Sequence, residues 1–410
     1  MKYADSRQHR IIVCILTTIA LTPLIARTIA IILTTDNFGW PAYNYFIGFE
    51  TGFGGRKLIG TVCNLLFPGY VRVPLIQTIV IVANVLLMAL TILFAAKCLS
   101  RIEAKPQLVF LLTIYLIAPF SILEWFYTGM SVIFMETYQM IIILVWLLLF
   151  INHHQKGWFH IVTILMVIVC VLIHHTFCCC FFPLVVALLV YEVFEGKQLS
   201  RKGVILASSV CVTTAILLAS IWLFSRMNIP IDALRARLDM KAESGILTQE
   251  PCALEMLYYM SNSGNAIYNL DYLYNQKLLE FLITVVLLSP LFAVLLFPMI
   301  YATHRAKMTP LKWRYIIMSV VLMFFPLPIF FLATDYGRWF TGWIFCLMAT
   351  NCVMNAIHDK YFNEGSAKIL SFYKRNYWLA LLLVVWLGCL HTISFEGLNE
   401  AILAQKYLSL

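Results

Sequence analysis

Long runs of apolar residues, separated by short charged segments, extend through the whole chain. Residues 79–96 and 379–390, for example, contain no charged side chain. Because an α-helix rises about 1.5 Å per residue and the hydrocarbon core of a bilayer is about 30 Å thick, about 20 such residues span it. The pattern predicts eleven transmembrane helices. The predicted spans are 11–33, 73–96, 107–123, 132–151, 158–174, 178–194, 204–225, 279–300, 315–333, 340–357 and 377–393.

Polar residues mark the ends of three of these spans. The third is expected to end just before Glu124, and the fifth and sixth to meet in a tight turn at His174, His175 and Thr176. The predicted fold is therefore an all-α, polytopic transmembrane bundle that forms one integral membrane domain over residues 1–410.

The composition and the charge distribution of the chain both fit a protein embedded in a lipid bilayer. Of 410 residues, 62% are hydrophobic and 12% charged, whereas an ordinary soluble domain is about a quarter charged. Lys and Arg lie mainly between the spans, eighteen on one side and ten on the other, with Arg27 inside the first span. Since positive loops face the cytoplasm, we expect the amino terminus inside and the carboxyl terminus outside. Topology thus explains the net charge of +9, so membrane lipid is an expected partner and nucleic acid is not.

Two long loops, 34–72 and 226–276, fall on the predicted outer side. From Arg56 onward, apolar residues recur at helical spacing opposite a polar face, which predicts a helix lying in the membrane interface. The apolar positions are Leu58, Ile59, Val62, Leu65 and Leu66, and the polar ones are Lys57, Thr61 and Asn64. The glycines before Arg56 form either an anion-binding turn or a plain turn.

The second long loop is expected to contain a helix after Pro230, with Leu234 and Leu238 on its apolar stripe. A Tyr-rich stretch follows at 256–274. Tyrosines in such number suit either a membrane-interface belt or stacking on sugar rings.

Candidate chemistry gathers on the same side. The segment Asp335-Tyr-Gly-Arg338-Trp339 lies in a short turn between two spans. A guanidinium presents paired donors to phosphate oxygens, so Arg338 is a candidate phosphate ligand. The alternative is a local Asp335–Arg338 pair that caps the turn.

Five carboxylates map to the outer ends of spans or to the outer loops: Asp36, Glu50, Glu124, Glu136 and Asp335. A carboxylate near hydrocarbon is costly unless partnered, and its raised pKa suits a general base. Asp36 leads these candidates, although ionised groups also mark membrane boundaries without a catalytic role.

Arg27 lies about two turns inside the first span. Such an arginine either binds a lipid phosphate or an outer carboxylate, or extends its side chain to the surface.

No metal site is predicted. His174 and Cys178, like His175 and Cys179, are one helical turn apart, but the expected turn falls there and no cluster completes a tetrahedral set. Most cysteines lie in or beside spans as small hydrophobes and form no disulfide framework, although a Cys63–Cys252 bond stays open. The chain has no Walker-type loop, HExxH or GxSxG motif, so ATP hydrolysis and zinc protease chemistry have no support.

The topology, with Asp36 after the first span, the helix at Arg56 and an outward Arg338, resembles two groups of bacterial envelope enzymes. These are the polysaccharide polymerases and the GT-C glycosyltransferases, which use polyprenyl-phosphate-linked sugars. The resemblance implies a multi-pass enzyme of the cytoplasmic membrane that transfers or polymerises sugars on its outer face. It makes Asp36 and Asp335 the candidate catalytic bases, and Arg27, Glu50, Arg56 and Arg338 candidate ligands of a lipid-linked sugar.

No organic cofactor is expected, and a divalent cation is left open. Two rival functions remain: a transporter or flippase for an amphiphilic or anionic substrate, and a membrane protein without catalysis. Transport predicts broken helices and internal symmetry. Pro119, Pro183, Pro290 and Pro298 are candidate interruptions, but we find no internal repeat.

Overall fold

The computed structural model describes residues 26, 28–34, 40–101, 105–128, 130–194, 199–243, 246–247, 254, 258, 278–307, 309–332 and 336–390. Regular structure within these ranges is helical, and a single parallel bridge pairs Val71 with Ala242. The predicted all-α fold is therefore confirmed. The elements before residue 200 are η1 (Trp40–Tyr45), η2 (Phe49–Thr51), α2 (Leu58–Leu66), α3 (Val73–Arg101), α4 (Lys105–Ile117), α5 (Ile122–Tyr127), α6 (Met130–Ile133), α7 (Glu136–His153), α8 (Gly157–Ile173), α9 (Phe177–Cys180) and α10 (Phe182–Val193). The later helices are α11 (Arg201–Phe224), α12 (Ile231–Lys241), α15 (Leu278–Arg305), α16 (Thr309–Phe324), α17 (Leu327–Leu332), α18 (Tyr336–Ala356), α19 (Lys360–Arg375) and α20 (Tyr377–Leu390).

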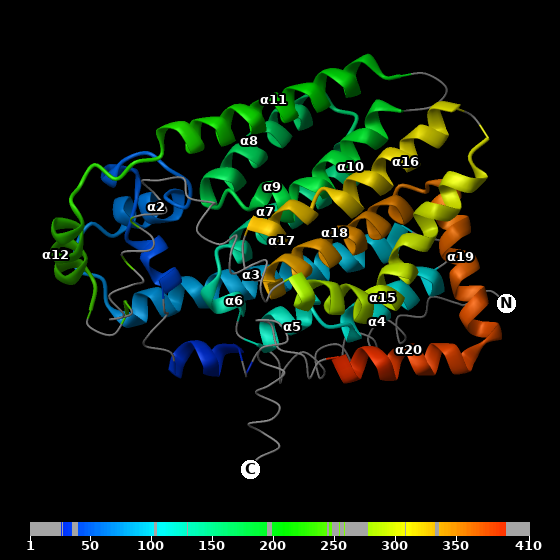
Figure 1. Ribbon diagram of the computed structural model, residues 1–410, viewed down its shortest axis with the longest axis horizontal. Helices are drawn as coiled ribbons and strands as arrows, with labels where there is room; N and C mark the ends of the chain where they lie inside the picture. The colour runs from blue at the N-terminus through cyan, green and yellow to red at the C-terminus, as the bar shows by residue number, and fades with distance from the viewer. Residues whose placement is uncertain are drawn as a thin grey trace, which may run out of the picture.

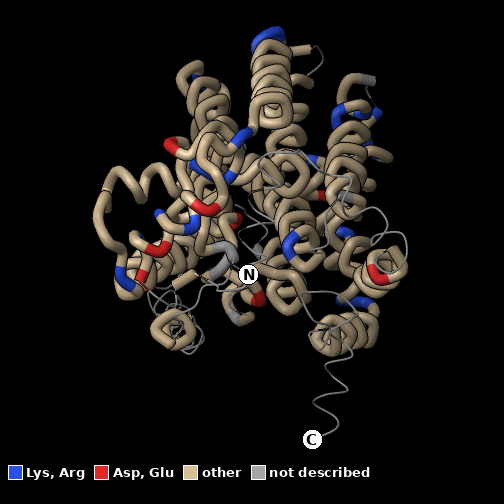
Figure 2. Tube along the Cα trace, turned by 60° about the vertical axis from the view of Figure 1, so that its left-hand side comes forward, with Lys and Arg blue, Asp and Glu red and all other residues tan. Residues whose placement is uncertain are grey.

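Six helical segments in the described part of the chain are long and apolar enough to cross a membrane, or seven if the bent pair α18–α19 counts as one span. Three shorter apolar helices, α8, α10 and α20, lie at other predicted spans. Of the first predicted span, only residues 26 and 28–33 are described, and they are helical. Few charged positions interrupt the helices (Figure 2).

The third predicted span, 107–123, coincides with an apolar helical segment in which the helix continues past Glu124. The apolar segment runs over Pro106–Phe126, with a break between α4 and α5. The Glu124 carboxylate turns back and accepts a hydrogen bond of 2.5 Å from the Phe120 backbone N–H, inside the break. The local backbone satisfies this carboxylate, and the helix can therefore continue past it.

Helix α18 forms the centre of the bundle (Figure 1). All its residues from Tyr336 to Ala356 are buried, as expected for a helix that is largely apolar on every side. Its amide side chains are hydrogen-bonded to neighbouring helices. Asn351 donates to the Leu295 carbonyl at 2.8 Å, and Asn355 donates to the Ser366 hydroxyl at 3.1 Å.

A helix that the sequence analysis did not predict, α19, turns away from α18 by 114°. Asp359 caps its first turn and also contacts Arg314 and Tyr315 of α16, which joins the two helices. Gly365 brings α19 against the backbone of α15, because a Cβ there would lie 2.7 Å from Cα of Pro298.

The two predicted outer loops fold together at the end of the molecule opposite α19, where Figure 1 labels α2 and α12. We name residues 40–72 and 225–243 the loop lobe. Its two parts are joined by backbone hydrogen bonds from Arg226 N to Phe53 O, from Asn228 N to Thr51 O and from Val71 N to Lys241 O, at 2.7–2.9 Å. The predicted helix after Pro230 is confirmed as α12, with Leu234 and Leu238 buried.

The predicted helix after Arg56 is confirmed as α2, and its polar face is turned inward. Thr61 accepts a hydrogen bond from the Phe49 N–H, and Asn64 donates to the Phe46 carbonyl. Leu65 and Leu66 are instead 77% and 66% exposed. An apolar face turned outward suits contact with lipid rather than with water.

Candidate functional site

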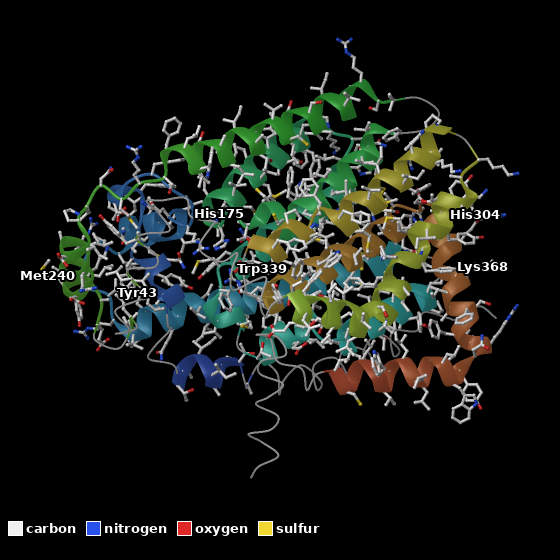
Figure 3. All side chains as sticks on the ribbon, in the orientation of Figure 1. Tyr43, His175, Met240, His304, Trp339 and Lys368 are labelled. Carbon is white, nitrogen blue, oxygen red and sulfur yellow. The ribbon has the colours of Figure 1, made fainter. Side chains whose placement is uncertain are left out.

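Six polar residues gather where the loop lobe meets the bundle, and we name them the polar cluster. They are Arg56, Glu136, His174, His175, Thr176 and Arg338. Arg56 precedes α2, Glu136 begins α7, the two histidines and Thr176 form the turn between α8 and α9, and Arg338 lies in the first turn of α18. In Figure 3, His175 and Trp339 lie between the loop lobe, marked by Tyr43 and Met240, and the opposite end of the molecule, marked by His304 and Lys368.

A buried ion pair holds the cluster together. The Arg338 Nη2 lies 2.6 Å from Oε1 of Glu136, and both side chains are 2% exposed. The guanidinium also lies 4.2 Å from the ring centre of Phe134 and 4.6 Å from that of Trp339. The ring faces and the carboxylate together offset the cost of burying this cation.

His174 and Thr176 extend the pair into a hydrogen-bonded network. The Thr176 hydroxyl contacts Nδ1 of His174 and donates to Oε1 of Glu136 at 3.3 Å. Gln139, one turn along α7 from Glu136, donates to the Cys170 and His174 carbonyls at 2.9 and 2.7 Å. These bonds satisfy carbonyls at the end of α8 and keep the turn in place.

His175 is the member of the cluster that faces the glycine-rich turn. Its ring stacks on His174 with centroids 5.2 Å apart, and a Cβ on Gly55 would lie 2.8 Å from its Nδ1. Only glycine allows so close an approach of the backbone. Burial lowers the pKa of His175, the nearby charges of Arg56 and Arg338 add to this effect, and the pKa falls to about 3. The imidazole is therefore neutral at pH 7, with one N–H donor and one acceptor.

Arg56 has a left-handed backbone, with φ of 67°. This conformation costs a non-glycine residue about 1 kcal/mol or more, and it persists where surrounding contacts over-determine it. The charge of Arg56 lies close enough to His175 to act on its imidazole.

Several buried polar atoms of the site have no hydrogen-bond partner within the described part of the chain. They are Oε2 of Glu136, Nε2 of His174, Nδ1 of His175 and Nε1 of Trp339. Such atoms are rare in folded proteins because leaving them unpaired costs about 1–3 kcal/mol each. Their concentration beside two arginines makes this cluster the candidate site for a polar ligand.

The structure brings two of the predicted site residues together. Arg56 and Arg338 both act electrostatically on His175. Glu50 lies elsewhere in the loop lobe, where its Oε1 contacts Asn64 at 2.5 Å and Arg237 at 3.2 Å. The predictions for Arg27, Asp36 and Asp335 concern residues outside the described ranges.

Sequence reasoning missed the histidines as part of this site and gave Glu136 no specific role. The one available signal was two adjacent histidines beside an expected turn. The His174–Cys178 spacing requires one continuous helix, but His174 is extended, with φ of −160° and ψ of 119°, and ends α8. Among the described residues no group of three or more His, Cys, Asp or Glu side chains has the arrangement of a metal site.

No protein-family model, curated protein or solved structure matches the chain. The fold and its apolar helices are compatible with a multi-pass helical membrane protein. The geometry of the polar cluster therefore carries the functional argument.

Proposed function

We propose that this chain is a multi-pass enzyme of bacterial cell-envelope polysaccharide assembly. It transfers or polymerises sugars from a polyprenyl-(di)phosphate-linked donor on the outer face of the cytoplasmic membrane. In this proposal the chain crosses the membrane eleven times, with its amino terminus inside and its carboxyl terminus outside. The observation that carries it is the buried Arg338, with Arg56 close to the same histidine, beside polar atoms that have no hydrogen-bond partner among the described residues at the edge of the loop lobe.

The reaction needs a cationic site for its leaving group. A hydroxyl of the acceptor attacks the anomeric carbon of the donor, the bond from that carbon to the phosphate oxygen breaks, and the electron pair leaves with the (di)phosphate. Arg56 and Arg338 stabilise that charge in a site from which water is largely excluded. A guanidinium has five N–H donors, and Oε1 of Glu136 contacts one terminal nitrogen of Arg338.

The acceptor proton passes to a carboxylate. Asp36 and Asp335 remain the proposed bases, and Arg27 and Glu50 remain proposed substrate ligands. Neutral His175 and the indole N–H of Trp339 supply further hydrogen bonds to substrate oxygens. The exposed apolar face of α2 supports a site at a membrane surface, where a lipid-linked donor would present its head group.

The test is sugar transfer by the full chain reconstituted in vesicles that contain a polyprenyl-diphosphate-linked sugar. Arg338→Lys keeps the charge but loses the paired donors, so we expect transfer to fall by about 100-fold. Arg72→Lys is the matched control, since Arg72 is an exposed arginine of the loop lobe, and it should transfer normally. Undiminished transfer by correctly folded Arg338→Lys protein would overturn the proposal.

Transport is the second candidate, and breaks in two membrane-length segments favour it. The breaks lie between α4 and α5, at Pro119, and between α16 and α17, at Pro326. Interrupted helices are typical of transporter binding sites. The same vesicles separate the two functions: movement of the lipid-linked sugar between leaflets without a new glycosidic bond favours transport.

A further inference from the structure

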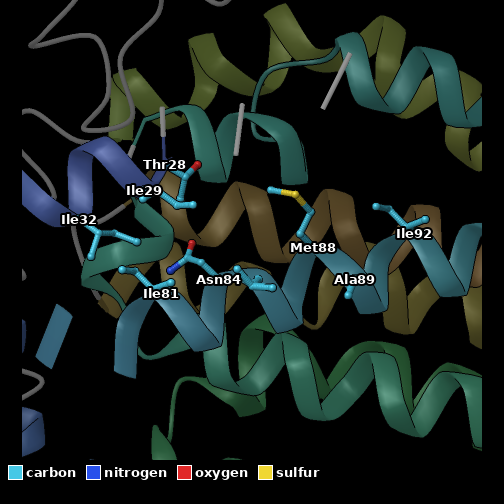
Figure 4. A pocket seen from close by; sticks show the side chains of 9 residues that line it. Thr28, Ile29, Ile32, Ile81, Asn84, Met88, Ala89 and Ile92 are labelled. Carbon is cyan, nitrogen blue, oxygen red and sulfur yellow. The ribbon is translucent and has the colours of Figure 1, made fainter. Parts of the chain in front are cut away.

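A groove on the side of the bundle lies between residues 28–32 and helix α3 (Figure 4). Its volume is about 200 Å³, the space of about seven water molecules. Its walls are apolar except for Thr28 and Asn84, and Figure 4 shows Ile29 and Ile32 facing Ile81 and Asn84 across the hollow.

The groove is open on the outer surface of the helical bundle. Val85 and Ile92 line it and are 51% and 41% exposed, and Leu86 beside them is 45% exposed. These residues belong to a 29-residue apolar helix of membrane-crossing length. Hydrocarbon, rather than water, is therefore the medium that meets the groove.

The depth of the groove in the membrane can be measured along α3 from Arg101, at the end of this helix away from the loop lobe. Arg101 donates to the Ile151 carbonyl at 2.9 Å and to the Asn152 side chain at 2.6 Å, which aligns the ends of α3 and α7. Asn84 precedes Arg101 by 17 residues, or about 25 Å of helix. Within the charge-free run 79–96 of α3, Asn84 lies about 8 Å from the end nearer the loop lobe, and Ile92 lies about 12 Å deeper.

Asn84 places a buried amide side chain at the part of the groove nearer the loop lobe. The side chain is 2% exposed, and its amide donates to the Val80 carbonyl at 2.9 Å and the Ser131 carbonyl at 3.2 Å. Its Oδ1 has no hydrogen-bond partner among the described residues. A buried carbonyl oxygen at this level, above an apolar groove, matches an amphiphile with a donor in its head group and a hydrocarbon chain below.

The groove also adjoins the polar cluster. The Ser131 carbonyl that accepts from Asn84 also accepts from the Thr137 hydroxyl at 3.0 Å. Glu136, next to Thr137, forms the ion pair with Arg338. The segment 131–137 therefore contacts the groove through one residue and the cluster through another.

We propose that this groove binds the hydrocarbon chain of the lipid-linked sugar donor, with a head-group hydroxyl or N–H donating to Oδ1 of Asn84. The inference rests on the proposed function, because that function supplies a ligand with a chain and a polar head at this level. Residues 84 to 92 of α3 are then the part of the protein closest to the first units of the chain.

The test is photocrosslinking in vesicles of phosphatidylethanolamine and phosphatidylglycerol. The probe is a polyprenyl phosphate with a diazirine in its chain. We expect it to label the peptide that contains residues 84–92, and unlabelled polyprenyl phosphate to compete. Ala89→Phe fills the groove, and Ile92→Phe narrows its open mouth, so each should reduce labelling by about tenfold. Leu86→Phe lies outside the groove on the same helix and should label like the parent.

Equal labelling of Ala89→Phe and Ile92→Phe in folded protein would overturn the inference. So would competition by added phosphatidylglycerol as strong as that by polyprenyl phosphate, which would identify an ordinary bilayer lipid as the occupant. Sugar transfer with no labelling of 84–92 would refute the groove alone. Labelling of 84–92 without any transfer would refute the proposed enzyme and leave the groove standing.

Discussion

Glu136 and Arg338 hold opposite charges where water hardly reaches, and each is the other's closest charged contact in the described part of the chain. Removing one charge from such a pair is more costly than the net contribution of the pair, because the other charge stays buried. Glu136→Gln should therefore destabilise the fold by about 3 kcal/mol. Thermal unfolding in detergent measures this loss.

The matched control for Glu136→Gln is Glu50→Gln. Glu50 also pairs with an arginine, but the side chains of that pair are 32% and 37% exposed, so the loss should be below about 1 kcal/mol. The double variant Glu136→Gln with Arg338→Gln should lose less than the sum of the single losses. Simple additivity, or equal losses at both glutamates, would show that the buried pair is not coupled.

Lys57 makes the stability of the folded protein depend on pH. Its ammonium is buried in the loop lobe and donates to the Gly52 carbonyl at 2.8 Å. Burial lowers its pKa from 10.5 to about 8, against a smaller upward effect of Glu50. Between these values the unfolded chain holds a proton that the folded protein has released, so stability rises with pH across the window.

Comparison with Lys57→Met isolates this effect. As the pH rises from 8 to 10.5, the parent should gain stability relative to the variant, and below pH 8 the difference should level off. Thermal unfolding of both proteins in the same buffers measures the difference. A difference that stays flat or falls across that range would contradict the assignment.

At the scale of elements, the crossing of α19 over α15 depends on Gly365. A Cβ at this position would lie 2.7 Å from the Pro298 backbone, which cannot move aside as a flexible side chain can. Gly365→Ala should therefore destabilise the protein by about 1–3 kcal/mol and expose α19 to protease. Gly388→Ala in α20 meets no atom within 4 Å and should be neutral or stabilising by up to about 1 kcal/mol. Equal effects of the two changes would refute the tight crossing.

The elements also show where reading the sequence succeeds. Runs such as 79–96 predict helices because apolar length alone decides whether a segment can cross a bilayer. Helix α19 was missed because Phe362, Gly365, Ser366 and Ile369 form its buried stripe among charged residues. The composition of the segment marks it as a charged connection between spans, and the helical spacing of this stripe is the signal that predicts the helix.

At the scale of the whole molecule, the loop lobe and α19 lie at opposite ends (Figure 1). The distribution of Lys and Arg predicts that the loop lobe faces outward. A membrane-impermeant maleimide should therefore label Met240→Cys on intact cells, since Met240 is 74% exposed. Lys368→Cys should react only after the membrane is opened, with the parent as the background for native cysteines. The reverse pattern would invert the predicted orientation.

Local periodicity and length are enough to predict from the amino-acid sequence the helical class, the position of most apolar helices, α2 and α12. The sequence also singled out Arg56 and Arg338 by residue type. That these arginines share a site with His175 follows from the folded arrangement alone, because the loop before α2, the α8–α9 turn and α18 are far apart in sequence. Likewise the folded arrangement paired Glu136 with Arg338 and placed Glu50 elsewhere, since burial and contact choose between carboxylates that look alike along the chain.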